Sequence, residues 1–247
     1  MRPRPNQAAA LRLFCFPYAG MGASVFRSWT TEFPSNVELC FVQPPGRESR
    51  WSEQACVSIQ DLAPAAAEAL TPYLTLPFAF FGHSLGALTS FEVARVLRRR
   101  NLPQPRHLFV SAHRAPHLPN PHPPLRHLGD QQFVAEIAAQ YNGIPQAVLE
   151  NPDLIELMLP CLRADFTAFE TYRHEAEPPL SCPITAFGGR SDPRVGEAEV
   201  AAWREHTSGA FECAQFAGDH FFLQSSRDAL LTVVRREIAA MSAPAAR

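Results

Sequence analysis

The sequence lacks the features of a membrane or nucleic-acid-binding protein. No apolar run approaches the ~20 residues that a membrane-spanning helix needs. The first ten residues carry charge but no apolar stretch of the kind found in a signal peptide. The formal net charge is −2, and no basic tract is suited to a phosphate backbone. We therefore expect a cytoplasmic protein that binds neither nucleic acid nor a membrane.

Cysteine occurs without any metal-binding or disulfide pattern. The six cysteines lie far apart in the sequence, and none forms a C-x-x-C pair. This spacing argues against a zinc site and against a disulfide framework, so we expect reduced thiols. The cysteines are Cys15, Cys40, Cys56, Cys161, Cys182 and Cys213.

The chain has enough apolar residues for one large domain. Of its 247 residues, 46% are hydrophobic and 19% are charged, which is typical of a globular protein. Short apolar runs alternate with helical patterns, which predicts an α/β fold with a mostly parallel central sheet flanked by helices. We predict strands near Leu11–Phe16, Val37–Gln43, Phe78–Phe81, His107–Ala112, Pro183–Phe187 and Phe211–Phe216. We predict helices near Ala23–Glu32, Asp61–Tyr73, Leu85–Arg100, Glu197–His206 and Ser225–Met241.

One segment, residues 116–179, interrupts this alternation. It opens with a proline-rich stretch that no regular element tolerates. Two or three helices follow: Phe133, Ile137 and Tyr141 recur at helical spacing, and a second apolar stripe runs from residue 154 to 162. We interpret the segment as a helical lid over a pocket; a decorative subdomain is the alternative. We expect the ends, residues 1–10 and 242–247, to be disordered, which leaves 11–241 as the domain.

The strongest local motif is Gly82-His83-Ser84-Leu85-Gly86. It follows an apolar strand and opens a helix, which is the setting of the G-x-S-x-G nucleophile elbow of α/β-hydrolases. The sharp turn exposes the serine Oγ at the carboxyl edge of the sheet, and Gly82 and Gly86 leave room for neighbouring backbone. We predict Ser84 as the nucleophile of a serine hydrolase; a structural glycine-rich turn is the alternative.

A serine nucleophile needs a histidine base, which follows the acid in the chain order of this fold. His174, His206 and His220 are the candidates in the C-terminal third. His220 stands just after the last predicted strand, on the loop into the final helix. His206 ends an amphipathic helix and suits a capping role, whereas His174 lies in the segment 116–179. We therefore predict His220 as the base.

The acid partner has two candidates. Asp192 follows the predicted strand 183–187 through a short loop, which places it on the same sheet edge as Ser84. Asp219 is adjacent to His220, so its side chain would have to turn back to reach the ring. We predict Asp192 and keep Asp219 as the rival.

An oxyanion hole needs two backbone N–H groups beside the nucleophile. Leu85, at the start of a helix, supplies one in the predicted arrangement. The first strand ends in a glycine-rich turn, residues 16–23, that runs into a helix at the same edge. We predict Ala19 of this turn as the second donor, although the turn could also be a plain connection.

Together these motifs resemble the type II thioesterases that accompany modular polyketide synthases and nonribosomal peptide synthetases. The resemblance spans roughly residues 11–240, and six stretches carry it: Phe16-Pro17-Tyr18-Ala19-Gly20, Pro45-Gly46-Arg47-Glu48, Gly82-His83-Ser84-Leu85-Gly86, Ser111-Ala112-His113-Arg114-Ala115-Pro116, Leu162-Arg163-Ala164-Asp165-Phe166 and Gly218-Asp219-His220-Phe221-Phe222.

The resemblance implies a free-standing enzyme that cleaves acyl groups from the phosphopantetheine arm of an acyl or peptidyl carrier protein. It implies the triad Ser84, Asp192 and His220, with Ala19 and Leu85 as oxyanion donors. No metal or organic cofactor is expected, and we expect a monomer.

The sequence departs from the family pattern at two positions. Met21 and Asp219 stand where glycine is common. A carboxylesterase acting on small oxygen esters and a catalytically silent carrier-binding module remain as alternatives. For docking of a carrier protein, we expect Arg114 or Arg126 to contribute, because both follow a strand on the Ser84 edge. We expect no such role for Arg98–Arg100, at the far end of the helix that starts after Ser84.

Overall fold

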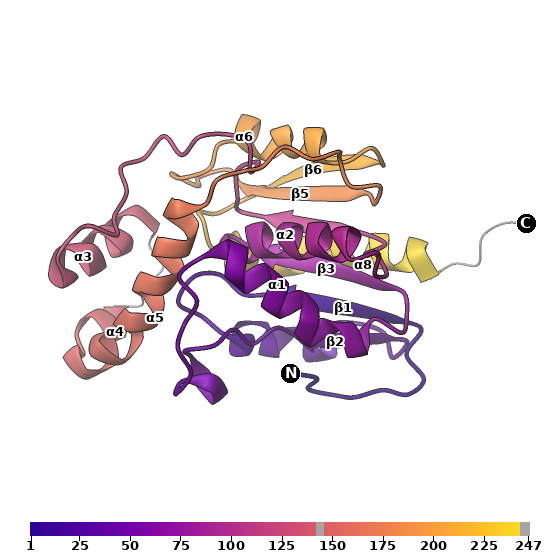
Figure 1. The fold of residues 1–247 in the computed structure, drawn as a ribbon, viewed down its shortest axis with the longest axis horizontal. Coiled ribbons are helices and arrows are strands. Elements are labelled where there is room, and N and C mark those ends of the chain that lie inside the picture. Colours follow the sequence, from indigo (N-terminus) through magenta and orange to yellow (C-terminus); the bar gives the residue numbers. More distant parts are fainter. Residues whose placement is uncertain (142–145, 243–247) are drawn as a thin grey trace, which may run out of the picture.

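Six parallel strands form the centre of the molecule in the computed structural model, which describes residues 1–141 and 146–242. Their order across the sheet is β2-β1-β3-β4-β5-β6 (Figure 1). The strands are β1 (Leu11–Phe16), β2 (Val37–Phe41), β3 (Phe78–His83), β4 (Leu108–Ser111), β5 (Ile184–Gly189) and β6 (Phe211–Phe216). Every neighbouring pair is parallel, so the predicted parallel sheet and its six strands are confirmed.

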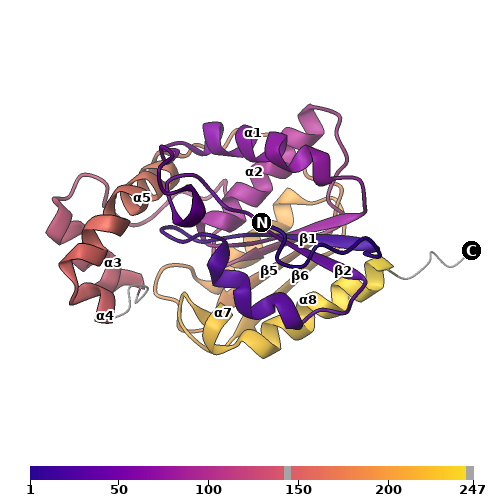
Figure 2. The ribbon, with the colours of Figure 1, turned by 90° about the horizontal axis from the view of Figure 1, so that it is seen from below.

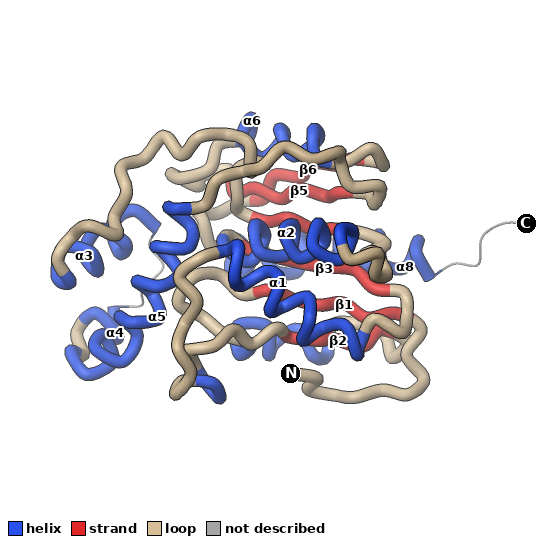
Figure 3. Tube along the Cα trace, in the orientation of Figure 1, coloured by secondary structure: helices blue, strands red, loops and turns tan. Residues whose placement is uncertain are grey.

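Helices cover both faces of the sheet (Figures 2 and 3). One face is covered by α1 (Ile59–Leu70), α2 (Leu85–Arg99), α6 (Glu197–Ala201) and the 3-10 helix η4 (Ala202–His206). The other face is covered by the 3-10 helix η1 (Ala23–Thr31), α7 (Phe222–Ser225) and α8 (Arg227–Ser242). Two short 3-10 helices, η2 (Glu48–Arg50) and η3 (Thr71–Tyr73), lie before and after α1 in the connection between β2 and β3.

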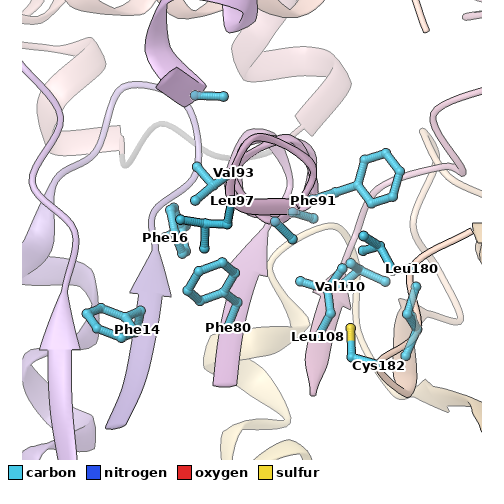
Figure 4. Close-up of a cluster of buried hydrophobic side chains, with 14 of the residues drawn as sticks. Phe14, Phe16, Phe80, Phe91, Val93, Leu97, Leu108, Val110, Leu180 and Cys182 are labelled. Carbon is cyan, nitrogen blue, oxygen red and sulfur yellow. The ribbon is translucent and has the colours of Figure 1, made fainter. Parts of the chain in front are cut away.

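Successive strand residues point to opposite faces, so the sheet contributes side chains to two separate hydrophobic cores, one on each face. Phe80 packs in the core under α1 and α2, together with Leu108 (Figure 4). The next residue, Phe81, packs with Phe109 in the core under η1 and α8. All four side chains are fully buried, which explains why the strands appear in the sequence as continuous apolar runs.

The predicted helices occur, with differences in detail. The segment predicted as a helix over 23–32 is the 3-10 helix η1. Its sequence contains two serines, Val25 and two threonines, residues that stabilise an α-helix poorly. The helix predicted over 197–206 divides into α6 and η4. The final helix begins earlier, at Phe222 in α7, and starts again at Arg227 in α8.

The segment between β4 and β5 is helical and extends from the carboxyl edge of the sheet (Figure 1). It contains α3 (Asp130–Tyr141), α4 (Gln146–Leu149) and α5 (Pro152–Thr171). A small cluster of its own, which includes Phe133, Leu162 and Phe166, holds α3 against α5. We refer to these helices as the insertion.

The two ends of the chain differ. We expected residues 1–10 to be disordered, but in the structure they lie against β2. The amino group of Met1 donates a hydrogen bond to the Phe41 carbonyl at 2.5 Å, and Arg2 forms an ion pair with Glu38. At the other end, Ser242 closes α8, and the remainder of the expected disordered tail lies outside the described residues. No helix within residues 1–141 and 146–242 is long and apolar enough to cross a membrane.

Candidate active site

Ser84 occupies a sharp turn between β3 and α2. Its backbone has φ 53° and ψ −119°, a conformation that a residue with a side chain rarely adopts. The Ser84 N–H donates to the Ser111 carbonyl at 2.7 Å, which ties the turn to β4. A Cβ on Gly82 would lie 2.1 Å from the Gly86 carbonyl oxygen, and one on Gly86 would lie 2.2 Å from that of Phe16. The turn therefore requires glycine at both positions, as the motif predicted.

The three residues predicted as a triad form one chain of hydrogen bonds. His220 follows β6, and its Nε2 lies 3.0 Å from Ser84 Oγ. Its Nδ1 lies 2.8 Å from Asp192 Oδ2. The side chains of His220 and Asp192 are buried. Because a carboxylate only accepts, Nδ1 carries a hydrogen, and Nε2 faces the serine hydroxyl, from which it can accept when it carries no hydrogen itself.

The rival residues have other partners. Asp219 Oδ1 accepts the N–H of Phe221 at 2.9 Å, within its own loop, whereas Asp192 Oδ1 accepts the N–H of Arg194 at 2.8 Å. His206 Nε2 is 2.8 Å from His117 Nδ1, and the His174 ring packs edge-on against His206. The geometry therefore favours Asp192 and His220 over their rivals.

His83, the second residue of the motif, has a role that the sequence did not reveal. Its Nε2 lies 2.9 Å from the His220 carbonyl oxygen, and its Nδ1 lies 2.9 Å from Ser111 Oγ. Complete burial lowers the pKa of His83 well below its ordinary value, so the ring is neutral. Its Nε2–H then donates to the His220 carbonyl, and its Nδ1 accepts from the Ser111 hydroxyl. This side chain fixes the backbone of the His220 loop, but nothing in the motif distinguishes the position.

Two backbone N–H groups lie beside Ser84. Leu85 is the first residue of α2, and the first N–H groups of a helix have no acceptor within the helix. Ala19 lies in a turn closed by a hydrogen bond from the Met21 N–H to the Tyr18 carbonyl at 3.1 Å. In the part of the chain that the structure describes, neither the Ala19 nor the Leu85 N–H donates to a protein acceptor. Both residues line the same cavity as Ser84.

The insertion forms one wall of that cavity. The cavity has a volume of about 70 Å³. Its lining includes Met21 and Phe221 from the sheet loops and Ile137, Met158, Leu162 and Phe166 from the insertion. The Tyr141 ring, at the end of α3, packs edge-on against the His220 ring with centroids 5.1 Å apart. Within residues 1–141 and 146–242, no group of three or more His, Cys, Asp or Glu side chains could hold a metal ion.

Of the two arginines predicted to contribute to carrier docking, Arg114 is buried and Arg126 is partly exposed. Arg114 is only 5% exposed and donates to Asn120 and to the Arg194 carbonyl. Burial lowers the pKa of its guanidinium group. Arg114 therefore presents little charge to the surface, and the docking prediction, which named Arg114 or Arg126, now rests on Arg126. Arg126 is partly exposed and pairs with Glu170 at 3.4 Å.

Arg98 and Arg99 have an intramolecular partner. They pair with Glu177 at 2.6 and 2.5 Å, at the end of α2 that lies away from the insertion (Figure 1).

The chain resembles known thioesterases over nearly its full length. The thioesterase domain family matches residues 11–238. The gramicidin S biosynthesis protein GrsT of Aneurinibacillus migulanus is 42% identical over 239 residues, which cover 97% of this chain and 93% of that protein. Thioesterase PikA5 of Streptomyces venezuelae is 42% identical over 222 residues, which cover 90% of this chain and 78% of PikA5.

Solved structures agree with the sequence comparison. RedJ, a thioesterase of the prodiginine pathway in Streptomyces coelicolor, superposes with a TM-score of 0.89 at 42% identity, covering 96% of this chain and 94% of RedJ. BorB, a type II thioesterase of the borrelidin cluster, gives 0.87 at 35% identity and covers 96% of each chain. Family, relatives and fold thus lead to one conclusion: the chain belongs to the thioesterase family and is a thioesterase of the serine-hydrolase type.

Proposed function

We propose that this protein hydrolyses acyl thioesters on the phosphopantetheine arm of an acyl or peptidyl carrier protein. In this role it removes aberrant acyl chains from a polyketide or nonribosomal peptide assembly line. The observation that carries the proposal is the continuous hydrogen-bond chain from Ser84 Oγ through His220 to Asp192. The similarity to RedJ and BorB, which are thioesterases of biosynthetic pathways, supports the substrate class.

The proposed reaction starts with attack of Ser84 Oγ on the thioester carbonyl carbon. His220 Nε2 takes the hydroxyl proton, while Asp192 holds the ring in the required tautomer and stabilises the imidazolium. The N–H groups of Leu85 and Ala19 bind the oxyanion, a contribution of roughly 3–4 kcal/mol per donor in comparable enzymes.

The tetrahedral intermediate then collapses to an acyl-serine. The pantetheine sulfur leaves and takes a proton from His220. Water, deprotonated by the same ring, attacks the acyl-serine carbonyl, and Ser84 and a free carboxylic acid are regenerated. Every step uses groups that the chain itself supplies.

The insertion acts in this proposal as a lid. Its helices supply the apolar wall of the cavity that contains Ser84, which suits the hydrocarbon part of an acyl group. We further place the protein in the cytoplasm, where carrier-bound substrates are made, and infer that it acts as a monomer because one chain contains the whole triad.

Replacement of Ser84 tests the proposed nucleophile. We expect Ser84→Ala to reduce kcat at least ~10³-fold, because triad loss leaves only the background from the oxyanion hole and substrate binding. The measurement is thiol release from an acyl-pantetheine thioester. A variant that keeps a tenth of the wild-type rate would show that Ser84 is not the nucleophile.

The same assay separates the alternative functions. Turnover of a matched oxygen ester at a higher kcat/KM than the thioester would make the protein an esterase. Failure of a serine-reactive phosphonate to label the wild type, under conditions in which it labels a known thioesterase, would indicate a silent binding module.

A further inference from the structure

A buried ion pair connects two loops of the sheet edge to the insertion. Arg47, between β2 and α1, forms a bidentate pair with Asp165 of α5, 118 positions away in the sequence. The two Nη–Oδ distances are 2.5 and 2.8 Å. The exposed fractions are 7% for Arg47 and 2% for Asp165. Burial tends to lower the pKa of Arg47, but the hydrogen bonds and charge of Asp165 hold it above its ordinary value, so the guanidinium group is charged.

This pair also holds the turn that contains Ala19. Asp165 Oδ2 accepts the N–H of Gly20 at 2.7 Å, and Arg47 Nη1 donates to the Met21 carbonyl at 3.3 Å. Gly20 has φ +79°, and the Met21 N–H closes the turn onto Tyr18. This combination is typical of a type II turn, in which the middle peptide carries the Gly20 N–H.

The charge of Asp165 selects one orientation of that middle peptide. In the observed orientation the carboxylate receives an N–H. If the peptide rotated by half a turn, the Ala19 carbonyl would face the carboxylate instead, and two acceptors would repel each other. The turn is also packed against α5, because a Cβ on Gly20 would lie 2.9 Å from Leu162 Cδ1. The conformation of the Ala19–Gly20 peptide therefore depends on α5 through both a charge and a contact, and this peptide adjoins the Tyr18–Ala19 peptide, which carries the Ala19 N–H.

We propose that Arg47 and Asp165 are positioning residues for the thioesterase reaction: they hold the Tyr18–Met21 turn so that the Ala19 N–H points at the oxyanion. Because Asp165 belongs to the insertion, the oxyanion hole is complete only when α5 is seated on this turn. The inference rests on the proposed function, since it assigns a task to the same oxyanion hole. Arg47 belongs to the P-G-R stretch of the sequence and Asp165 to the R-A-D-F stretch, so the proposal assigns one structural role to both stretches.

The test compares ligands that do and do not use the oxyanion hole. An alkyl boronic acid forms a tetrahedral adduct on the serine, whereas a non-hydrolysable acyl-pantetheine amide binds as the ground state. For Asp165→Asn we expect kcat/KM and boronate affinity to fall together by about 10- to 100-fold, somewhat less than the loss of a whole donor. We expect the dissociation constant of the amide to change less than about threefold, because ground-state binding makes no use of the hole.

A second buried pair provides the matched control. Glu38, on the edge strand β2, has a buried side chain that pairs with Arg12 at 2.6 Å and also with Arg2. Glu38→Gln removes the same charge from a comparable site. We expect it to lower thermal stability and to leave the ratio of boronate to amide affinity at the wild-type value.

Arg47→Lys provides a second variant in case Asp165→Asn does not fold. Lysine keeps the positive charge but cannot bridge both carboxylate oxygens, so we expect an intermediate loss of about 3- to 10-fold in boronate affinity. Equal losses for boronate and amide, or no loss in either variant, would overturn the inference. A wild-type protein without thioesterase activity would instead refute the proposed function, so the two failures are distinguishable.

Discussion

The sheet and the insertion meet at Ser84 but are anchored to very different degrees. Strands β1 to β5 are composed almost entirely of buried residues. In α5, by contrast, the buried residues begin at Cys161, and the first half of the helix exposes Leu154 by 40% and Leu157 by 68%. The triad sits on loops of the well-anchored part, whereas much of the pocket wall belongs to the weakly anchored part. The catalytic residues and the substrate-facing wall of the pocket thus lie in regions that differ in how deeply their side chains are buried.

The contrast is not complete, because several contacts couple the regions, and two of them lie close to the triad. Asp165 of α5 binds the turn next to the nucleophile, and Tyr141 of α3 packs on the His220 ring. Both contacts lie where the insertion reaches the sheet edge. A movement of the insertion would therefore alter the active site as well as open the pocket. The predictions below test how far the two regions can be treated separately.

The largest effect is expected from the acid on the sheet side. Asp192→Asn should lower kcat by about 10⁴-fold, because the amide favours the wrong imidazole tautomer. Asp219→Asn should lower kcat less than about tenfold, since Asp219 accepts a hydrogen bond within its own loop. Both variants can be compared in one thiol-release assay. The reverse ranking would assign the acid role to Asp219.

A smaller effect is expected for the same substitution made in each region. Leu108 of β4 is fully buried, so Leu108→Ala should reduce the free energy of unfolding by roughly 3–5 kcal/mol. Leu157→Ala, on the exposed side of α5, should change it by less than about 0.5 kcal/mol. Urea denaturation measures both. A cost above ~1 kcal/mol for Leu157→Ala would show that the outer face of α5 is packed against something, contrary to the contrast drawn above.

The anchored region is also the region that could be predicted from the sequence. Continuous apolar runs such as 78–81 can only be buried strands here, and short helices between them imply parallel pairing. The elbow is local: a strand, five residues and a helix determine its shape. His220 and Asp192 follow from strand ends, because parallel strands present their carboxyl ends at one edge.

Contacts across long sequence distances could not be predicted in this way. The Arg47–Asp165 pair joins residues 118 positions apart, and no periodicity links them. The burial of Arg114 was missed for the same reason, because its partners Asn120 and Arg194 come from different segments. His83 looked like a variable position of the motif until its contact with the His220 carbonyl was seen. Local patterns specify elements, whereas the coupling between elements appears only in the folded chain.

Buried histidines give the anchored region a distinctive dependence on pH. Burial lowers the pKa of His107 to about 4, and it does the same for His113. Unfolding returns each group to its ordinary value of 6.5. Between these values the unfolded chain binds more protons than the folded one, so stability falls as the pH decreases. Each such histidine contributes about 1.4 kcal/mol per pH unit well inside this window.

His107 allows this contribution to be isolated, because it precedes the first residue of β4, at the opposite end of the strand from the loops that carry the triad, and its Nε2 lies 2.8 Å from Thr185 Oγ1. Between pH 6.5 and 5.5, wild-type protein should lose about 1 kcal/mol more unfolding free energy than His107→Gln, which has no group to protonate there. His127→Gln, at an exposed position before α3, should follow the wild type. Urea denaturation at the two pH values gives the comparison. If His107→Gln lost as much as the wild type, burial at this position would not be depressing the pKa. If His127→Gln also flattened the curve, the acid sensitivity would extend into the insertion, and the two regions would not differ in this respect.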